Sequence, residues 1–178
     1  MMPIGPLMIE HRLIERMIKL VDREAGTMKG IGKVDIAFID AAIEFIRTYA
    51  DHCHHGKEED ILFADLSHRD ISPEHHEMVK SLIGDHVWAR QKVGQLVSAK
   101  ERLANGQASA LQDVISLLEA LAGFYPEHIR KEDREFFLPV MNYYSKQEQD
   151  DMLQAFWEYD RKLIHEKYRA LVETLEKA

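Results

Sequence analysis

The stretch from residue 51 to residue 63 reads DHCHHGKEEDILF and contains the pair His55-x-x-x-Glu59. Residues four apart lie one turn apart on the same face of an α-helix, so this imidazole and this carboxylate point in the same direction. The spacing recurs at His128-x-x-x-Glu132. In both copies an aspartate comes directly after the glutamate, and a phenylalanine lies four positions after it. Two copies of one imidazole–carboxylate pair predict a metal site between helices.

The bulk composition narrows the class of protein. Hydrophobic residues make up 46% and charged residues 30% of 178 residues, which is ordinary for one globular domain. No apolar run is long enough for a membrane span, and the N-terminus lacks the pattern of a signal peptide. The single cysteine excludes an internal disulfide framework, and a net charge of −8 without a basic stripe argues against nucleic acid as a partner. We therefore expect a cytoplasmic protein with no membrane partner.

Glycine and proline are few and clustered, and they separate long segments in which apolar residues recur every three and four positions. We expect Gly26 to end the first helix, Ser72-Pro73 to begin the third, and the capping box Ser145-x-x-Glu148 to begin the fifth. The expected helices cover about residues 7–25 and 33–67, residue 73 to the Asn105-Gly106 break, that break to about 144, and about 145–176.

These elements predict an all-α fold. Long helices with short connections favour an up-down-up-down four-helix bundle, here over about residues 7–144, with an additional C-terminal helix in a single domain of residues 1–178.

The remaining two bundle helices each carry a histidine on the apolar stripe, His11 and His86. His55 lies about 12 residues before the end of its helix and His86 lies 13 residues after Pro73, so the two side chains come to similar heights on antiparallel neighbours. His86 and His128 match in the same way, and His11 matches less closely. Four histidines and two carboxylates are therefore expected to meet in the core.

Buried carboxylates are costly unless they are paired or bound to a metal. A shell of four imidazoles and two carboxylates suits iron, zinc or manganese better than calcium or magnesium, and it exceeds the needs of one tetrahedral zinc. The set fits two metals, each with two histidines, bridged by both carboxylates. Positions left open on the metals would bind dioxygen, peroxide or nitric oxide.

Four segments carry a family resemblance: EHRLIERM, DHCHHGKEEDILF, DHVWAR and PEHIRKEDREFFLP. Over about residues 8–140 they resemble, in order, the motifs of the hemerythrin-like (HHE cation-binding) family. The resemblance implies a four-helix bundle with a non-haem di-iron centre that is oxo- or hydroxo-bridged, with iron favoured over zinc or manganese. Carried over by position, the metal ligands would be His11, His55, Glu59, His86, His128 and Glu132.

Within this set, the resemblance assigns the bridging role to Glu59 and Glu132. One iron would then have His11 and His55, and the other His86 and His128. The oxygen-carrying members have a further histidine at the position of Arg90, so one iron here would have one protein ligand fewer. That departure favours chemistry or sensing with a small diatomic ligand or peroxide over oxygen storage; a homodimer is left open.

Other functions stay open at this point. The first is a non-enzymatic iron-binding or sensing module, and the second is a bundle in which metals only stabilise the fold. A third, iron–sulfur cluster repair, is less favoured because the cysteine-bearing N-terminal segment of those relatives is not seen in this sequence.

Several neighbours of the motif residues have two interpretations each. His54 is expected to point about 100° away from His55, toward packing or solvent. Glu58 and Asp133 are either surface charges or carboxylates that orient a ligand imidazole. Tyr125 is expected in the core, with a hydrogen bond to a metal-bound ligand as the alternative.

Overall fold

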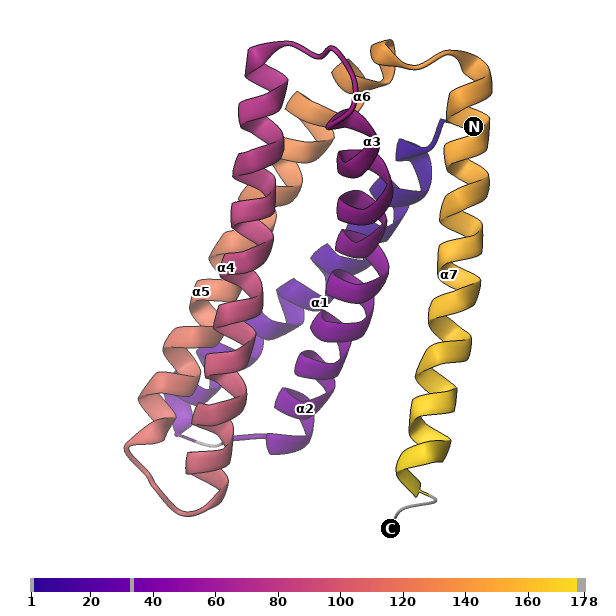
Figure 1. The fold of residues 1–178 in the computed structure, drawn as a ribbon. Helices are drawn as coiled ribbons and strands as arrows, with labels where there is room; N and C mark the ends of the chain where they lie inside the picture. Colours follow the sequence, from indigo (N-terminus) through magenta and orange to yellow (C-terminus); the bar gives the residue numbers. More distant parts are fainter. Residues whose placement is uncertain (1, 33, 176–178) are drawn as a thin grey trace.

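The computed structural model describes residues 2–32 and 34–175, with side chains described as far as residue 163. Lys33, where we expected the second helix to begin, and residues 176–178, at the end of the expected last helix, lie outside this part of the chain. The described residues form helices and connections without any strand, which confirms the all-α class. The described helices form antiparallel rods, with the last helix beside them (Figure 1).

The first and third rods are single α-helices, whereas the second and fourth are composite. The first rod is α1 (Ile4–Ile31), and the third is α4 (Pro73–Ala104). The second contains α2 (Ile36–Phe45), η1 (Ile46–His55), η2 (Glu58–Phe63) and α3 (Ala64–Leu66). The fourth contains α5 (Ala110–Lys131), η3 (Glu132–Phe136), α6 (Phe137–Val140) and the 3₁₀ turn η4 (Met141–Tyr143).

The helix ends follow local chemistry. The Ser72 side chain accepts a hydrogen bond from the His75 backbone N–H, with Pro73 at the first helical position, as expected. The Ser145–Glu148 capping box is also confirmed: the Ser145 N–H donates to the Glu148 carboxylate at 2.7 Å, and the Glu148 N–H donates to Ser145 Oγ at 3.3 Å.

The end predicted for the first helix was wrong. The helix continues past Gly26 because its buried stripe continues through Met28. It ends at Gly32, whose φ of 65° is a left-handed cap that favours glycine.

Three segments, η1, η2 and η3, are π-helical, and all three lie at the height of the His/Glu motifs. A π-helical turn closes its hydrogen bond over five residues instead of four, so it is wider and rotates less per residue. We expected α-helical turns over these segments. The wider turns change which neighbouring side chains face the interior.

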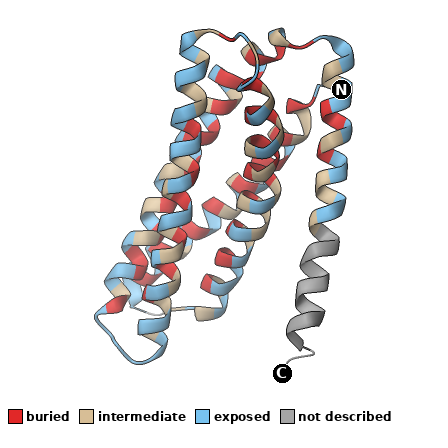
Figure 2. Ribbon diagram, in the orientation of Figure 1, coloured by how far each residue is buried: buried red, intermediate tan, exposed pale blue. Residues whose placement is uncertain are grey.

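Two apolar cores fill the bundle, one on each side of the motif level, and Figure 2 shows buried residues along the facing sides of the rods. In α1, Ile4 and Leu7 belong to one core and the residues from Ile14 onward to the other. His11 lies between them. The second rod runs through the same layers in the opposite order, as antiparallel packing requires.

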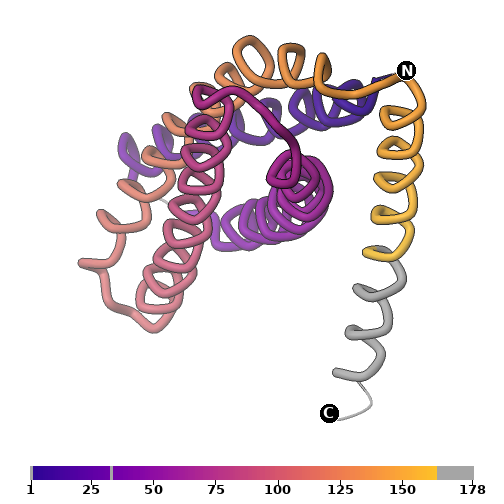
Figure 3. The backbone as a smooth tube through the Cα atoms, turned by 45° about the horizontal axis from the view of Figure 1, so that its top comes forward, coloured from indigo at the N-terminus to yellow at the C-terminus, as the bar shows by residue number. Residues whose placement is uncertain are grey.

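The additional helix, α7 (Lys146–Leu175), packs on η1 and η2 of the second rod (Figure 3). Close approach occurs at Gly56, where an added Cβ would lie 2.1 Å from Tyr159 Oη. The Tyr159 hydroxyl also donates to Asp60 at 3.3 Å. Among the described residues, none of the helices has the length and apolar content needed to cross a membrane.

Candidate metal centre

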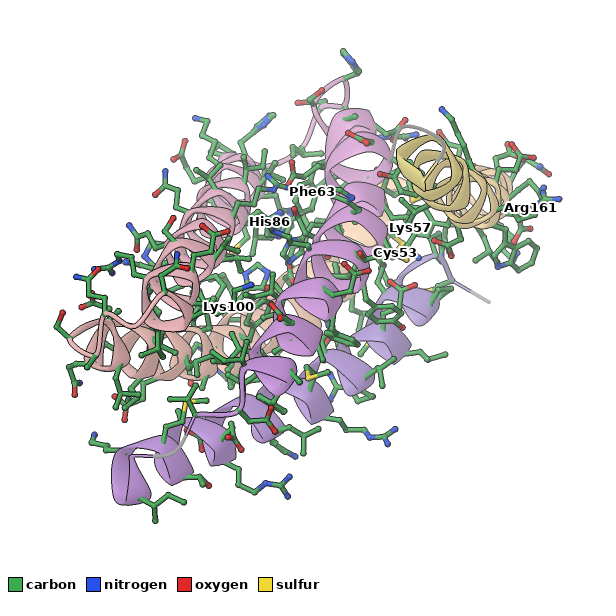
Figure 4. The ribbon with its side chains drawn as sticks, turned by 90° about the horizontal axis from the view of Figure 1, so that it is seen from below. Cys53, Lys57, Phe63, His86, Lys100 and Arg161 are labelled. Atoms are coloured by element: carbon green, nitrogen blue, oxygen red, sulfur yellow. The ribbon has the colours of Figure 1, made fainter. Side chains whose placement is uncertain are left out.

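Two adjoining groups of potential ligands meet between the two cores. In each group, one ligand atom per residue lies within 4.8 Å of the others, and all the residues are buried. Figure 4 shows His86 pointing into the interior of the bundle. The first group is His11, His54, Glu58 and Glu132, and the second is His55, His86 and His128.

Two carboxylates, which we call the inner carboxylates, reach histidines of both groups. Glu132 Oε2 lies 3.2 Å from His11 Nε2 and 3.4 Å from His128 Nε2. Glu58 Oε1 lies 3.4 Å from His54 Nε2, and Glu58 Oε2 lies 3.5 Å from His86 Nε2. Glu58 therefore directs one oxygen toward each group, and Glu132 shares one oxygen between the two groups. A carboxylate that bridges two metals needs such a position.

On the outer side, every one of these imidazoles faces a carboxylate through Nδ1. We call these the outer carboxylates. An ionised carboxylate only accepts hydrogen bonds, so each bonded Nδ1 carries a proton, and in the neutral imidazole Nε2 is then the lone pair that faces inward. The pairs are His11–Asp133 at 2.7 Å, His54–Glu10 at 2.9 Å, His86–Glu59 at 2.7 Å, His128–Asp85 at 3.3 Å, and His55–Asp51 at the longer distance of 3.4 Å.

A third layer of cations holds the outer carboxylates. Arg90 donates to Asp51 at 2.8 Å and to Glu59 at 2.7 Å, so it joins the carboxylates behind His55 and His86. The other pairs are Arg12 with Asp133, Lys57 with Glu10, and Lys131 with Asp85. Lys57 is itself buried and also contacts Asp160 of α7 at 2.8 Å. Lys57 and Cys53 lie on the side of the second rod that faces α7 (Figure 4).

The two halves of the bundle repeat this arrangement. Glu10-His11 in the first half corresponds to Asp85-His86 in the second. The acids Glu10 and Asp85 each bond a histidine on the next rod. His11 stacks on Phe137, and His86 stacks on Phe63. On the other two rods, His54, Lys57, Glu58 and Glu59 correspond in the same order and role to His128, Lys131, Glu132 and Asp133. His55 corresponds to Ile129 and breaks the symmetry.

The structure places Glu59 differently from the sequence-based prediction. We expected Glu59 as a bridging carboxylate, but it lies behind His86 as an outer carboxylate and pairs with Arg90. Glu58, expected at the surface or behind a ligand, is an inner carboxylate and fully buried. His54, expected to point away, is buried in the first group. His11, His55, His86, His128 and Glu132 all lie in the two groups.

The grouping of the histidines and the role of Arg90 also differ from expectation. His54 takes the place beside His11 that we gave to His55, and His55 joins His86 and His128. The histidine missing at Arg90 thus does not leave the second group short of imidazoles. Arg90 instead ties two outer carboxylates together.

A signal for the correct frame was present in the sequence. The segment HHGKEE contains two overlapping His-x-x-x-Glu pairs, His54–Glu58 and His55–Glu59. Matching Phe63 to Phe136 selects the second pair. The triplets Lys57-Glu58-Glu59 and Lys131-Glu132-Asp133 match in the other frame, which pairs Glu58 with Glu132. Phe63 corresponds in the structure to Phe137, so matching it to the adjacent Phe136 selects the other pair.

Burial and close contacts shift the proton affinities of the ligand atoms. Burial would lower the pKa of His11, but the hydrogen bond with Asp133 and the nearby Glu132 carboxylate outweigh it and raise that pKa to about 9. Burial, with the nearby His11, lowers the pKa of His54 to about 4. Burial and the neighbouring Glu132 carboxylate raise the pKa of Glu58 well above its ordinary value. A bound cation would reverse the last effect, because it favours the ionised carboxylates.

The centre leaves polar atoms unpaired that a metal would satisfy. Nε2 of four histidines and all four oxygens of the inner carboxylates are buried without a hydrogen-bond partner. Unpaired buried polar groups are rare in folded proteins, because each costs about 1–3 kcal/mol. The histidines whose Nε2 is unpaired are His11, His54, His86 and His128. The donor set therefore fits metal cations that accept mixed nitrogen and oxygen ligands.

An all-α bundle with two buried groups of imidazoles and carboxylates defines a helical protein with a candidate metal centre. Comparison with protein families agrees: the model of the hemerythrin HHE cation-binding domain matches residues 2–138. The chain belongs to this family. Searches among curated proteins and among solved structures found no match.

Proposed function

We propose that this protein is a non-haem di-iron protein that binds or reacts with dioxygen, peroxide or nitric oxide. The observation that carries the proposal is the set of inward-facing, unpaired ligand atoms in two adjoining groups. His11 and His54 would hold one ion, and His55, His86 and His128 the other. Glu58 and Glu132 would bridge the ions. Iron is favoured by the family and by the mixed donor set, ahead of zinc or manganese.

A pair of iron ions, when bound, supplies open coordination positions and electrons for reaction with a small ligand. The chain's own residues prepare for this. The outer carboxylates accept the Nδ1 proton of the bonded imidazoles and so fix Nε2 as the nitrogen that faces the centre. The inner carboxylates supply negative charge against the cations, and the apolar cores on both sides keep bulk water out.

Metal analysis combined with optical spectroscopy tests this proposal. Protein produced in iron-replete cells is expected to contain about two irons per chain and to show a near-ultraviolet absorption band after exposure to air. The band should disappear on anaerobic reduction. Folded protein from these cells that contains no iron would contradict the assignment.

A second candidate is a sensing module without turnover, and one structural feature favours it. Buried polar contacts run from His54 through Glu10 and Lys57 to Asp160 on α7, so the metal centre is connected to the helix outside the bundle. A change in metal state would alter hydrogen exchange in α7. Steady consumption of peroxide or nitric oxide by the reduced protein, without any change in exchange of α7, would exclude this candidate.

A further inference from the structure

A cavity of about 400 Å³ lies beside the second group of ligands, between η1, α4 and α5. Its floor includes His55 and Tyr125, its walls are the apolar side chains of Ile46, Ala89 and Val93, and Arg47 and Arg90 line it as well. Small-molecule sites in proteins have volumes of roughly 300–1,000 Å³. A diatomic molecule needs only a small part of this space, so the cavity has room for an organic ligand.

Tyr125 presents an unpaired donor to this cavity. Its exposed fraction is 1%, and its hydroxyl is buried without a hydrogen-bond partner. Tyr125 lines the cavity together with Asp51 and Arg90. Buried tyrosine hydroxyls usually have a partner. A ligand oxygen in the cavity would provide one.

The charges around the cavity favour an anion. Arg47 is exposed and forms no hydrogen bond or ion pair with any residue in the described part of the chain. Arg90 uses three of its N–H groups on Asp51 and Glu59, which leaves two of five for another acceptor. The one acidic wall residue, Asp51, is neutralised by Arg90 at 2.8 Å. Arg90 is shared between Asp51 and Glu59, so the unpaired positive charge at the cavity is that of Arg47.

We propose that this cavity binds a small organic anion with a carboxylate head and a short aliphatic body. Tyr125 and the free N–H groups of Arg90 would donate to the carboxylate, and Ile46, Ala89 and Val93 would pack against the aliphatic carbons. Arg47 would add long-range attraction at the mouth. None of these residues is a candidate metal ligand, so the site goes beyond the proposed di-iron function and can be tested separately from it.

Isothermal titration calorimetry with sodium butanoate tests the site on the full chain, with metal content measured on the same sample. Saturable binding at millimolar concentration is expected, with butan-1-ol at least about tenfold weaker because it lacks the charge. Tyr125→Phe removes only the hydroxyl and should weaken butanoate about tenfold. Val93→Phe should abolish binding by filling the cavity. Tyr49→Phe, at a half-buried tyrosine outside the cavity, is the matched control.

Two results would overturn the proposal. One is the absence of saturable butanoate binding to folded wild-type protein. The other is binding that Tyr125→Phe and Val93→Phe leave unchanged, since the anion would then contact a metal or the surface and not this cavity. Metal content decides the di-iron proposal independently: protein with two irons that fails to bind butanoate refutes only the cavity, and metal-free protein that binds it refutes only the di-iron centre.

Discussion

Glu58 and Glu59 are chemically identical neighbours with opposite positions relative to the centre. Glu58 is fully buried with both oxygens unpaired, whereas the Glu59 side chain is 24% exposed and is bonded to His86 and Arg90. The contrast makes them a matched pair, because the same substitution in the same helical segment removes an inner charge in one case and an outer charge in the other.

Glu58→Gln is expected to lower metal affinity far more than Glu59→Gln. Loss of an outer carboxylate typically weakens metal binding about 10-fold to 100-fold, and Glu59→Gln should fall in that range. Glu58→Gln removes the charge that we propose to bridge two cations and should leave at most one metal per chain after gel filtration. Competition with a chromogenic chelator measures both. Equal losses, or a larger loss for Glu59→Gln, would restore Glu59 as the bridge.

The raised pKa of His11 predicts that metal binding depends on pH. In the metal-free protein, the folded pKa of about 9 exceeds the ordinary value of 6.5, so the charged imidazole stabilises the fold below pH 6.5 and this contribution is lost as pH rises through 9. A metal needs the neutral imidazole and must displace that proton. Apparent zinc affinity should therefore rise by about tenfold per pH unit within this window.

Asp133→Asn is the control for this pH effect. It removes the carboxylate that most raises the pKa of His11, so the slope of zinc affinity against pH should become shallower. Zinc is used because it has no redox chemistry. Chelator competition at several pH values gives the slopes, and a wild-type affinity independent of pH between 6.5 and 9 would contradict the prediction.

At the scale of the elements, the sequence predicted where the helical rods lie better than it predicted which of their side chains face the interior. Apolar spacing, Ser72-Pro73 and the Ser145–Glu148 capping box located the helices because these signals are local. The inward direction of His54 depends on a π-helical turn, which only the packing of neighbouring rods determines. The outer carboxylate pairs, such as Asp133 with His11 across 122 residues, are contacts between rods that periodicity along one rod does not reveal.

Gly56 lets α7 approach the second rod, and Gly56→Ala is expected to disturb that packing. The new Cβ would lie 2.1 Å from Tyr159 Oη and 2.8 Å from its ring, so the ring and its bond to Asp60 must move. A loss of about 1–3 kcal/mol, typical of overpacking, would lower Tm by roughly 2–4 °C per kcal/mol in a chain of this size. Thermal denaturation and hydrogen exchange of α7 are the measurements.

A matched glycine and a relief variant make this result specific. Gly84 is also helical, and an added Cβ would meet nothing within 4 Å, so Gly84→Ala should leave stability unchanged or raise it. Tyr159→Ala combined with Gly56→Ala should recover much of the lost stability by removing the clash. Equal effects of Gly56→Ala and Gly84→Ala would show that α7 does not need this close approach.

For the whole molecule, the repeated halves explain why a polar centre can lie in the middle of a folded bundle. Each half contributes two histidines, an inner carboxylate, outer carboxylates and cations in the same order, so the charges alternate outward from the centre. His55 is present in only one half, and the cavity proposed for an organic anion adjoins it. The two metal positions are therefore expected to differ.

Metal removal should weaken the molecule at its middle without dissolving its two apolar cores. The unpaired Nε2 and carboxylate oxygens lose their partners in metal-free protein, but the residues of both cores do not depend on the metal. At metal concentrations about 1,000 times the dissociation constant, binding contributes about 4 kcal/mol, which corresponds to a fall in Tm of roughly 10 °C on chelation. Circular dichroism should show retained helix, while hydrogen exchange increases around the second rod's η1 and η2. A melting temperature that is unchanged by complete metal removal would mean that the unpaired atoms are satisfied in some other way, and the centre would lose its main support.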